Sequence, residues 1–202
     1  MRRLEGAALQ AQMNPHFIFN CLNSIQNFIL NNDPDAAALY LTRFAKLVRG
    51  ALNASVAGQV SLEDEAGMLD NYLALEQLRF KQAFDYRIEV DETLDRAGTL
   101  LPPLIVQPFV ENAVLHGMKD IEKDGHITVT FRRDGEHLRV DVQDNGSGME
   151  GREWSGGNLS LGRSITRRRL ELLQWQHAQK TVSVQYFVPE SGGTMVSIRL
   201  PL

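Results

Sequence analysis

Carboxylate, amide and glycine residues gather in two short segments in the second half of the chain. Residues 108–117 read PFVENAVLHG on a predicted helix, and residues 144–149 read DNGSGM at the end of a predicted strand. On its own, the second segment is typical of a hairpin turn or of a loose calcium loop. Calcium is excluded, because the oxygen-rich spacing and the closing Glu of an EF-hand do not follow Asp144. The two segments together are therefore more informative than either alone.

Together these segments resemble the N-box and first glycine box of an ATPase superfamily. Type II topoisomerases, heat-shock chaperones, mismatch-repair ATPases and histidine kinases share it, and the resemblance extends across the second half of the chain. It implies that the chain binds ATP with Mg²⁺, that Asn112 holds the metal against the triphosphate, and that Asp144 accepts a hydrogen bond from the adenine amino group. An amide oxygen suits Mg²⁺, which takes its other ligands from waters and phosphates. A buried carboxylate disfavours guanine, which presents a carbonyl at that position.

The same resemblance assigns further contacts with the nucleotide. Gly146 and Gly148 would let the backbone approach the base or the phosphates without a Cβ in the way. His116 and Lys119 resemble phosphate contacts, although a cation beside a helix C-terminus is often only a partner for the helix dipole. The pair Gly193-Thr194 matches a glycine–threonine pair whose hydroxyl supports the adenine site, with a plain hairpin turn as the alternative.

The second glycine box matches less closely. Residues 160–166, SLGRSIT, contain the single glycine Gly162 where many relatives have two or three. Gly162 still precedes a predicted helix over 164–176, and the free N–H groups at a helix N-terminus favour a phosphate. The glycine-containing linker 151–159 is predicted to be a short flexible lid. The arginines at 167–169 fall on several faces of one helical turn, which indicates a solvated surface.

A histidine segment in the first half decides among the members of the superfamily. Residues 12–20 read QMNPHFIFN and closely resemble the acceptor segment of the LytS-like sensor histidine kinases, and the resemblance continues through 22–25. It implies that His16 receives the γ-phosphate. A lone histidine on an amphipathic helix is usually structural, but the ATP-binding half supports the acceptor role. A neutral imidazole keeps a nucleophilic nitrogen near pH 7, and the phosphorylated ring is a high-energy donor to an aspartate.

Glu111 and Asn20 are the two other residues with a predicted catalytic role. The larger kinase families carry an acidic residue after the acceptor histidine, whereas this chain has Phe17, so another base must take the imidazole proton. The resemblance implies Glu111, beside the metal ligand, and a solvated glutamate is the alternative. Asn20 lies one helical turn after His16, where other kinases orient a water that removes phosphate from the partner. The alternative for Asn20 is an interhelical hydrogen bond.

Helices must position the histidine segment. Apolar residues recur at helical spacing over 4–52, and the turn cluster at 31–34 divides them into two antiparallel helices, with Asp33 or Asp35 capping the second. A capping box at 61–64 predicts a third helix to about residue 80. A lone hairpin leaves an apolar face uncovered, so two hairpins are predicted to pair as a four-helix bundle in a homodimer.

The second half, which must hold the ATP site, mixes strands with helices. Strands are predicted over 86–90, 126–132, 138–144, 181–187 and 194–200, and helices over 104–117 and 164–176. Because strict βαβ alternation is missing, the order favours an α+β sandwich with helices on one face of a mixed sheet. The predicted domains are residues 1–80, for dimerisation and the acceptor histidine, and residues 81–202, for ATP binding.

Composition excludes several other classes of function. The 202 residues are 43% hydrophobic and 23% charged, as in a globular protein, and a net charge of −4 argues against nucleic-acid binding. Cys21 is the only cysteine, so no intrachain disulfide can form, and a cytoplasmic setting is expected. No run of about eighteen apolar residues predicts a membrane span. Attachment to an inner-membrane receptor would therefore depend on a sensor region outside this sequence.

These predictions describe the catalytic core of a sensor histidine kinase in two-component signal transduction. It would transfer the γ-phosphate of Mg-ATP to His16 and then to an aspartate on the receiver domain of a response regulator. One alternative is a serine/threonine kinase of the anti-sigma-factor type, which has a similar N-box but lacks an acceptor histidine segment. The other is a non-catalytic dimeric scaffold whose ATP site has decayed.

Overall fold

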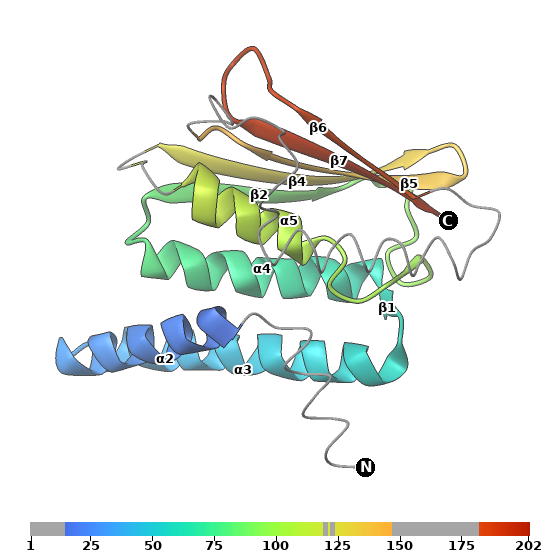
Figure 1. Cartoon of the computed structure of the whole chain (residues 1–202). Coiled ribbons are helices and arrows are strands. Elements are labelled where there is room, and N and C mark those ends of the chain that lie inside the picture. The colour runs from blue at the N-terminus through green and yellow to red at the C-terminus, as the bar shows by residue number, and fades with distance from the viewer. Residues whose placement is uncertain (1–14, 119–120, 122–123, 147–181) are drawn as a thin grey trace. The chain divides into compact units, whose positions relative to one another are not determined.

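The computed structural model describes residues 15–118, 121, 124–146 and 182–202 (Figure 1). The chain packs as two compact units. The first contains Met1–Gln82 and Arg96–Leu104, and the second contains Ala83–Asp95 and Ile105–Leu202. The predicted lid at 151–159, the helix at 164–176 and the arginines at 167–169 lie outside the described residues.

The described residues of the first unit form three helices. A short turn joins the first two into the predicted hairpin, and a pair of two-residue antiparallel strands, which the sequence did not predict, joins residues about forty positions apart. The elements are α2 (Pro15–Leu30), α3 (Pro34–Ala57), β1 (Val60–Ser61), α4 (Leu62–Arg79) and β3 (Leu100–Leu101).

Side-chain caps set the helix boundaries in this unit. Asp33 caps α3, because its Oδ1 accepts a hydrogen bond from the N–H of Ala36 at 3.1 Å, as one of the two predicted caps would. The helix ends at Gly58, whose φ of 74° is the left-handed conformation that favours glycine. Ser61 caps α4, since its hydroxyl accepts from the N–H of Asp64 at 3.1 Å and donates to the Asp64 carboxylate at 2.7 Å.

Aromatic and thiol groups hold the three helices together. The ring of Phe17, the residue after the acceptor candidate, packs against Tyr72 of α4 with centroids 5.1 Å apart. Tyr40 of α3 packs against Phe28 at 5.7 Å and donates a hydrogen bond to Cys21 Sγ at 3.6 Å. Burial raises the pKa of the Cys21 thiol to about 11, so this cysteine is a core residue rather than a reactive one. The acceptor helix is thereby fixed to α3 and α4.

The second unit contains a five-stranded sheet in the order β2-β4-β5-β7-β6. β2 and β4 are parallel, and the other neighbouring pairs are antiparallel, which confirms the predicted mixed sheet and α+β fold. The strands are β2 (Phe84–Val90), β4 (Gly125–Asp134), β5 (His137–Asp144), β6 (Ser183–Phe187) and β7 (Thr194–Pro201).

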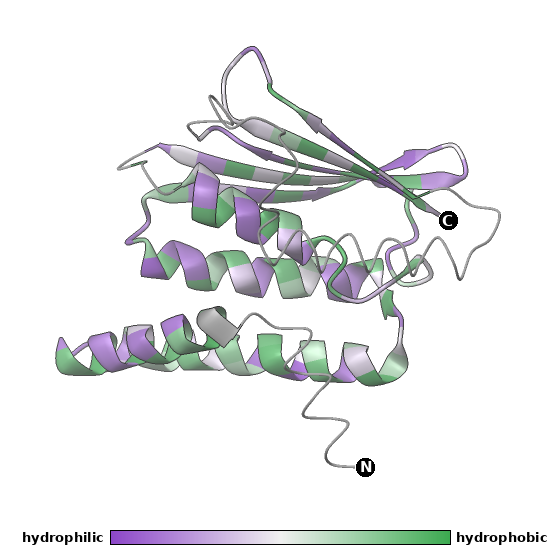
Figure 2. Cartoon of the chain, in the orientation of Figure 1, coloured by the Kyte–Doolittle hydropathy of each residue, from purple (hydrophilic) through white to green (hydrophobic). Residues whose placement is uncertain are grey.

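Apolar and polar residues alternate along the central strands, as the hydropathy colouring in Figure 2 shows. The apolar positions form one buried face of the sheet. The buried face includes Val129, Val142 and Ile198. Asp144, the last residue of β5, lies on this same face, because it pairs with Ile127 on one side and Thr194 on the other. A carboxylate therefore occupies the end of an otherwise apolar surface.

The N-box helix differs from the single helix predicted over 104–117. Leu104 has a φ of 57°, and its N–H donates to the buried Glu65 carboxylate at 2.9 Å, so the helix begins only afterwards. It consists of α5 (Gln107–Asn112) and a π-helical turn, η1 (Ala113–Gly117), in which the N–H of Met118 reaches back to the carbonyl of Ala113 at 3.2 Å. Such turns often occur at functional sites. Within the described residues, no helix is long and apolar enough to cross a membrane.

Candidate ATP site and acceptor helix

Asp144 is the centre of the candidate nucleotide site. Its residue is 5% exposed, and its Oδ1 accepts a hydrogen bond from the N–H of Gly146 at 3.0 Å. Burial raises the pKa of Asp144 above its ordinary value, and the backbone hydrogen bonds from Gly146 and Thr194 partly offset that rise. A buried acid on an apolar face costs free energy. Binding of a ligand by the carboxylate would explain why a buried acid occupies this position.

Three glycines allow a close backbone approach around Asp144, one beside its carboxylate and two beside neighbouring backbone atoms. A Cβ on Gly117 would lie 2.8 Å from Asp144 Oδ1, and a Cβ on Gly146 would lie 2.2 Å from the carbonyl oxygen of Gly117. A Cβ on Gly193 would lie 1.9 Å from the carbonyl oxygen of Asp144, and its φ of 81° also favours glycine. The end of η1, the loop after β5 and the start of β7 therefore meet at Asp144, and a larger residue at any of these positions would collide with backbone or carboxylate.

Two hydrogen bonds of the Asn145 side chain hold the loop after β5 in place. The Oδ1 of Asn145 accepts from the N–H of His126 at 2.6 Å, and its Nδ2 donates to the carbonyl of Asp124 at 2.9 Å. These contacts anchor the end of β5 to the start of β4. β5 pairs with β4 on one side and with β7 on the other, so neither of its edges is open to a hairpin partner formed by the residues that directly follow Asp144.

The other end of the candidate site lies on the N-box helix. Asn112, the predicted metal ligand, is half-buried at the last position of α5, about 7 Å along the helix axis from Gly117. Glu111 is also half-buried and accepts a hydrogen bond from the Nε2 of Gln107 at 2.9 Å. His116 is exposed in the last turn of η1. One short helix therefore connects the carboxylate that would read the base to the residues predicted to face Mg²⁺ and phosphate.

The structure brings some of the predicted site residues together, and some others lie outside the described residues. Gly146 and Thr194 bond Asp144 directly, as the sequence predicted them to share its site. Lys119, Gly148 and Gly162 lie outside the described residues. In the described part of the chain, no three His, Cys, Asp or Glu side chains cluster as metal ligands.

Sequence reasoning did not assign site roles to Gly117 or Gln107, and it singled out Gly193 only as the glycine paired with Thr194. Gly117 closes the N-box segment and Gly193 lies in the Gly-Gly turn before Thr194, so both were within segments already singled out. Only coordinates show that they touch Asp144. Gln107 lies four residues before Glu111, and this spacing on a helix is the signal that could have identified it.

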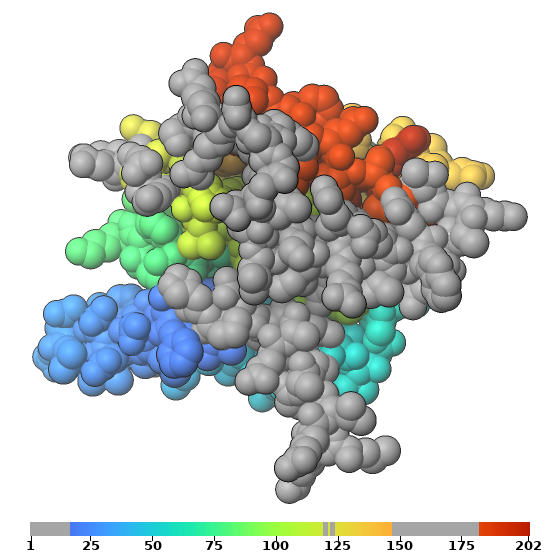
Figure 3. All heavy atoms as spheres, viewed as in Figure 1, coloured from blue at the N-terminus to red at the C-terminus, as the bar shows by residue number. Residues whose placement is uncertain are grey.

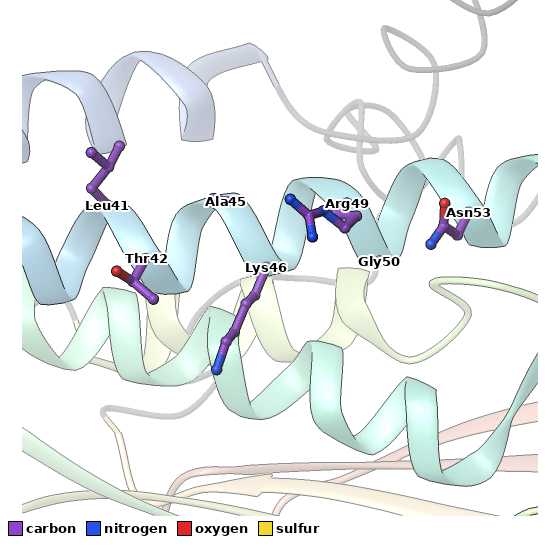
Figure 4. A pocket seen from close by; sticks show the side chains of 7 residues that line it. All are labelled: Leu41, Thr42, Ala45, Lys46, Arg49, Gly50 and Asn53. Atoms are coloured by element: carbon purple, nitrogen blue, oxygen red, sulfur yellow. The ribbon is translucent and has the colours of Figure 1, made fainter.

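The acceptor candidate belongs to the first unit. His16 is the second residue of α2, and Asn20 follows one turn later as a half-buried residue. A groove of about 560 Å³ lies in the same unit, on α3, where Figure 4 shows the side chains that line it. Lys46 and Arg49 give it a basic character. The groove is not the nucleotide site, whose predicted residues all belong to the second unit.

Two family models match the chain. The model described as histidine kinase matches residues 4–84. The model described as histidine kinase-, DNA gyrase B-, and HSP90-like ATPase matches residues 102–202, which are half of the chain. The first match contains the acceptor segment, and the second contains both ATPase boxes.

Curated relatives agree with these matches. The chain is 35% identical over 208 residues to sensor protein LytS of Streptococcus agalactiae serotype V, an alignment that covers 98% of this chain and 34% of the relative. It is 32% identical over 148 residues to sensor histidine kinase YpdA of Escherichia coli K12, which covers 73% of this chain and 26% of the relative. The chain thus spans about a third of the length of the curated relatives that it matches.

Solved structures share the fold. The histidine kinase domain of the Erythrobacter litoralis EL346 blue-light activated histidine kinase superposes with a TM-score of 0.57 and 18% identity, over 99% of this chain and 94% of that one. The catalytic domain of histidine kinase ThkA gives a TM-score of 0.51 and 16% identity, over 71% of this chain and 94% of that one. With its fold, both family models and its curated relatives in agreement, the chain belongs to the histidine kinase family, among the LytS-like sensor kinases.

Proposed function

We propose that this chain is the catalytic core of a protein-histidine kinase, which transfers the γ-phosphate of Mg-ATP to His16. The observation that carries the proposal is the buried Asp144 carboxylate, held by backbone N–H groups on an apolar sheet face with Gly117 packed against it. That arrangement fits a flat ring with an amino group on its edge. The apolar face would contact the ring, and the carboxylate would accept the amino hydrogen.

The residues of the N-box helix fit the other end of the nucleotide. Asn112 offers an amide oxygen to Mg²⁺, and Gly117 lies one and a half turns away against Asp144. Bound Mg-ATP would supply a phosphoryl group whose charge the metal neutralises. The protein would then contribute mainly binding and orientation.

The proposed transfer requires three things of the chain's own residues. An imidazole nitrogen of His16 attacks the γ-phosphorus with its lone pair, and the bond to the bridging oxygen breaks, so ADP leaves with that electron pair. The proton on the imidazolium passes to the Glu111 carboxylate. Asp144 and Asn112 hold the nucleotide while this occurs. Phe17 cannot serve as the base, because it is an apolar core residue that packs on Tyr72.

Transfer onward to an aspartate of a response-regulator receiver domain follows from the same chemistry. A phosphoramidate is a high-energy donor, so passing the phosphoryl group to a carboxylate is favourable. Asn20, one turn after His16 on α2, would orient a water for removing phosphate from the partner. This role rests on spacing and on the family, and the half-buried position of Asn20 is compatible with it.

We also propose that the chain acts as a homodimer through the α2–α3 hairpin. Large apolar side chains remain exposed on both helices, and α2 (blue) lies at the surface in Figure 3. Several large apolar side chains exposed on two neighbouring helices fit an interface, and a second hairpin would complete a four-helix bundle. The exposed residues are Phe19, Leu22, Ile29, Leu30, Leu39, Leu41 and Val56.

Labelling tests the central proposal. The chain is incubated with Mg²⁺ and γ-labelled ATP, and the attached label should survive alkali and be lost in acid, as a nitrogen–phosphorus bond requires. His16→Gln should abolish the label. His137→Gln is the matched control, because His137 lies at the far end of β5 from Asp144 and should retain labelling. An acid-stable label, or wild-type labelling of His16→Gln, would favour the serine/threonine kinase alternative. Absence of ATP binding would favour the alternative of a non-catalytic dimeric scaffold.

A further inference from the structure

We propose that Gln107 is a positioning residue, which holds the Glu111 carboxylate in the orientation needed to accept the imidazole proton. The inference rests on the proposed kinase function and adds a residue that the sequence did not single out. Gln107 is the first residue of α5, is 3% exposed, and donates from Nε2 to Glu111 Oε1 at 2.9 Å. The two residues are four apart, which places them on the same face of the helix.

The surroundings of Gln107 indicate that its amide has a specific purpose. The neighbouring residues Ile105, Val106 and Phe109 are buried and apolar. An apolar side chain of similar length, such as methionine, would fill the same volume without a polar group to satisfy. Unlike methionine, Gln107 has a side-chain amide, and the N–H of that amide donates to the proposed base. Removing the donor should therefore change the orientation of the Glu111 carboxylate.

The hydrogen bond from Gln107 restricts the orientation of the Glu111 side chain. Glutamate has several rotatable bonds, and Glu111 is only half-buried, so packing alone does not select one rotamer. A donor to Oε1 fixes the plane of the carboxylate and hence the direction of Oε2. Hydrogen bonds to an ionised acceptor are among the stronger ones. A misplacement of about 1 Å in a reacting group can cost about a hundredfold in rate.

A double-mutant cycle tests this arrangement. Gln107→Met, Glu111→Gln and the double variant are compared with the wild type for autophosphorylation rate, ATP affinity and melting temperature. Gln107→Met should slow autophosphorylation by about 10–100-fold and leave ATP affinity within about twofold, because neither Asp144 nor Asn112 is touched. The double variant should be no slower than Glu111→Gln alone, since Gln107 acts only through that carboxylate.

A second variant and a control keep the test decisive if Gln107→Met proves unstable. Gln107→Asn keeps an amide but is one methylene shorter, so it should break the 2.9 Å contact and give the same loss of rate. Asn71→Leu removes a different helical amide, which donates to the backbone of Gly67 in α4, and should leave the rate unchanged.

Two results would overturn the inference while the wild type remains active. One is a wild-type rate in both Gln107 variants. The other is a double variant whose loss equals the product of the two single losses, because an independent structural role predicts additive free energies. If the wild type itself neither binds ATP nor labels His16, the proposed function fails instead, so the two failures are distinguishable.

Discussion

Gly117→Ala is the substitution whose effect follows most directly from the coordinates. The added Cβ would lie 2.8 Å from both the Cγ and the Oδ1 of Asp144, about 0.6 Å closer than an ordinary van der Waals contact of 3.4 Å. Oδ1 is also the atom that accepts the hydrogen bond from Gly146 at 3.0 Å. The carboxylate cannot move away from residue 117 without disturbing that bond and the position from which it would read adenine.

The expected loss of ATP affinity can be bounded from this geometry. A hydrogen bond to a charged group contributes about 1.5–3 kcal/mol, and about 1.4 kcal/mol corresponds to a tenfold change in Kd. If the displaced Asp144 loses one such bond to the nucleotide, Gly117→Ala should raise the Kd for ATP by about 10–150-fold. Isothermal titration at fixed Mg²⁺ measures this directly, and circular dichroism checks that the fold is retained.

Gly67→Ala is the matched control. Gly67 lies in the interior of α4, is exposed, and an added Cβ there meets nothing within 4 Å. The substitution should leave ATP affinity unchanged and stabilise the fold by about 0.5–1 kcal/mol, the usual gain when alanine replaces glycine in a helix. Wild-type ATP affinity in a folded Gly117→Ala protein would refute the assignment of Asp144 as the adenine contact.

Four further predictions concern the other residues. Burial raises the pKa of Asp144, so the ionised carboxylate opposes folding, and the stability that the protonated form provides is lost as pH rises from the ordinary pKa of 3.8 through the raised pKa. Asp144→Asn should therefore raise the melting temperature of the nucleotide-free protein more at pH 7 than at pH 4.5. The same substitution should abolish ATP binding. Asn112→Ala should remove only the Mg²⁺-dependent part of ATP affinity in titrations with and without the metal. Asn20→Ala should prolong the partner's phospho-aspartate lifetime without slowing His16 phosphorylation, and the reverse result would make Asn20 a packing residue. Leu22→Asp should convert a dimer to a monomer by analytical ultracentrifugation, and an unchanged sedimentation coefficient would contradict the hairpin interface.

Regular elements were predictable because their signals are local. Helical spacing and the caps Asp33 and Ser61 placed α3 and α4 within a few residues, and alternating hydropathy placed the central strands. The pairing of β1 with β3 was missed, since two residues per strand give no period to detect and the partners are far apart in sequence. A capped helix or an alternating strand is specified by its own residues, whereas such a pairing is specified by the rest of the fold.

The sequence identified the main residues of the candidate site, but it did not predict how they are arranged in space. The two ATPase boxes identified Asp144 and Asn112 as residues of one site. The left-handed conformation of Leu104, which delays the start of the N-box helix, depends on the distant carboxylate of Glu65. The approach of Gly117 to Asp144 depends on a π turn, for which this sequence shows no local signal.

Asp144 interrupts the apolar pattern of the buried face of the sheet. Its cross-strand neighbour Ile127 is fully buried, and Val142, two residues earlier on the same face, is nearly so. An apolar residue at position 144 would continue that surface and avoid burying a charge. The backbone donors at Gly146 and Thr194 reduce the penalty without removing it, since the pKa stays raised. A ligand that donates a hydrogen bond to the carboxylate would lower the penalty further. ATP is therefore expected to stabilise the protein by an amount set by its concentration relative to Kd, and the contact with Asp144 contributes to that Kd. Replacing Asp144 should weaken ATP binding and stabilise the nucleotide-free protein.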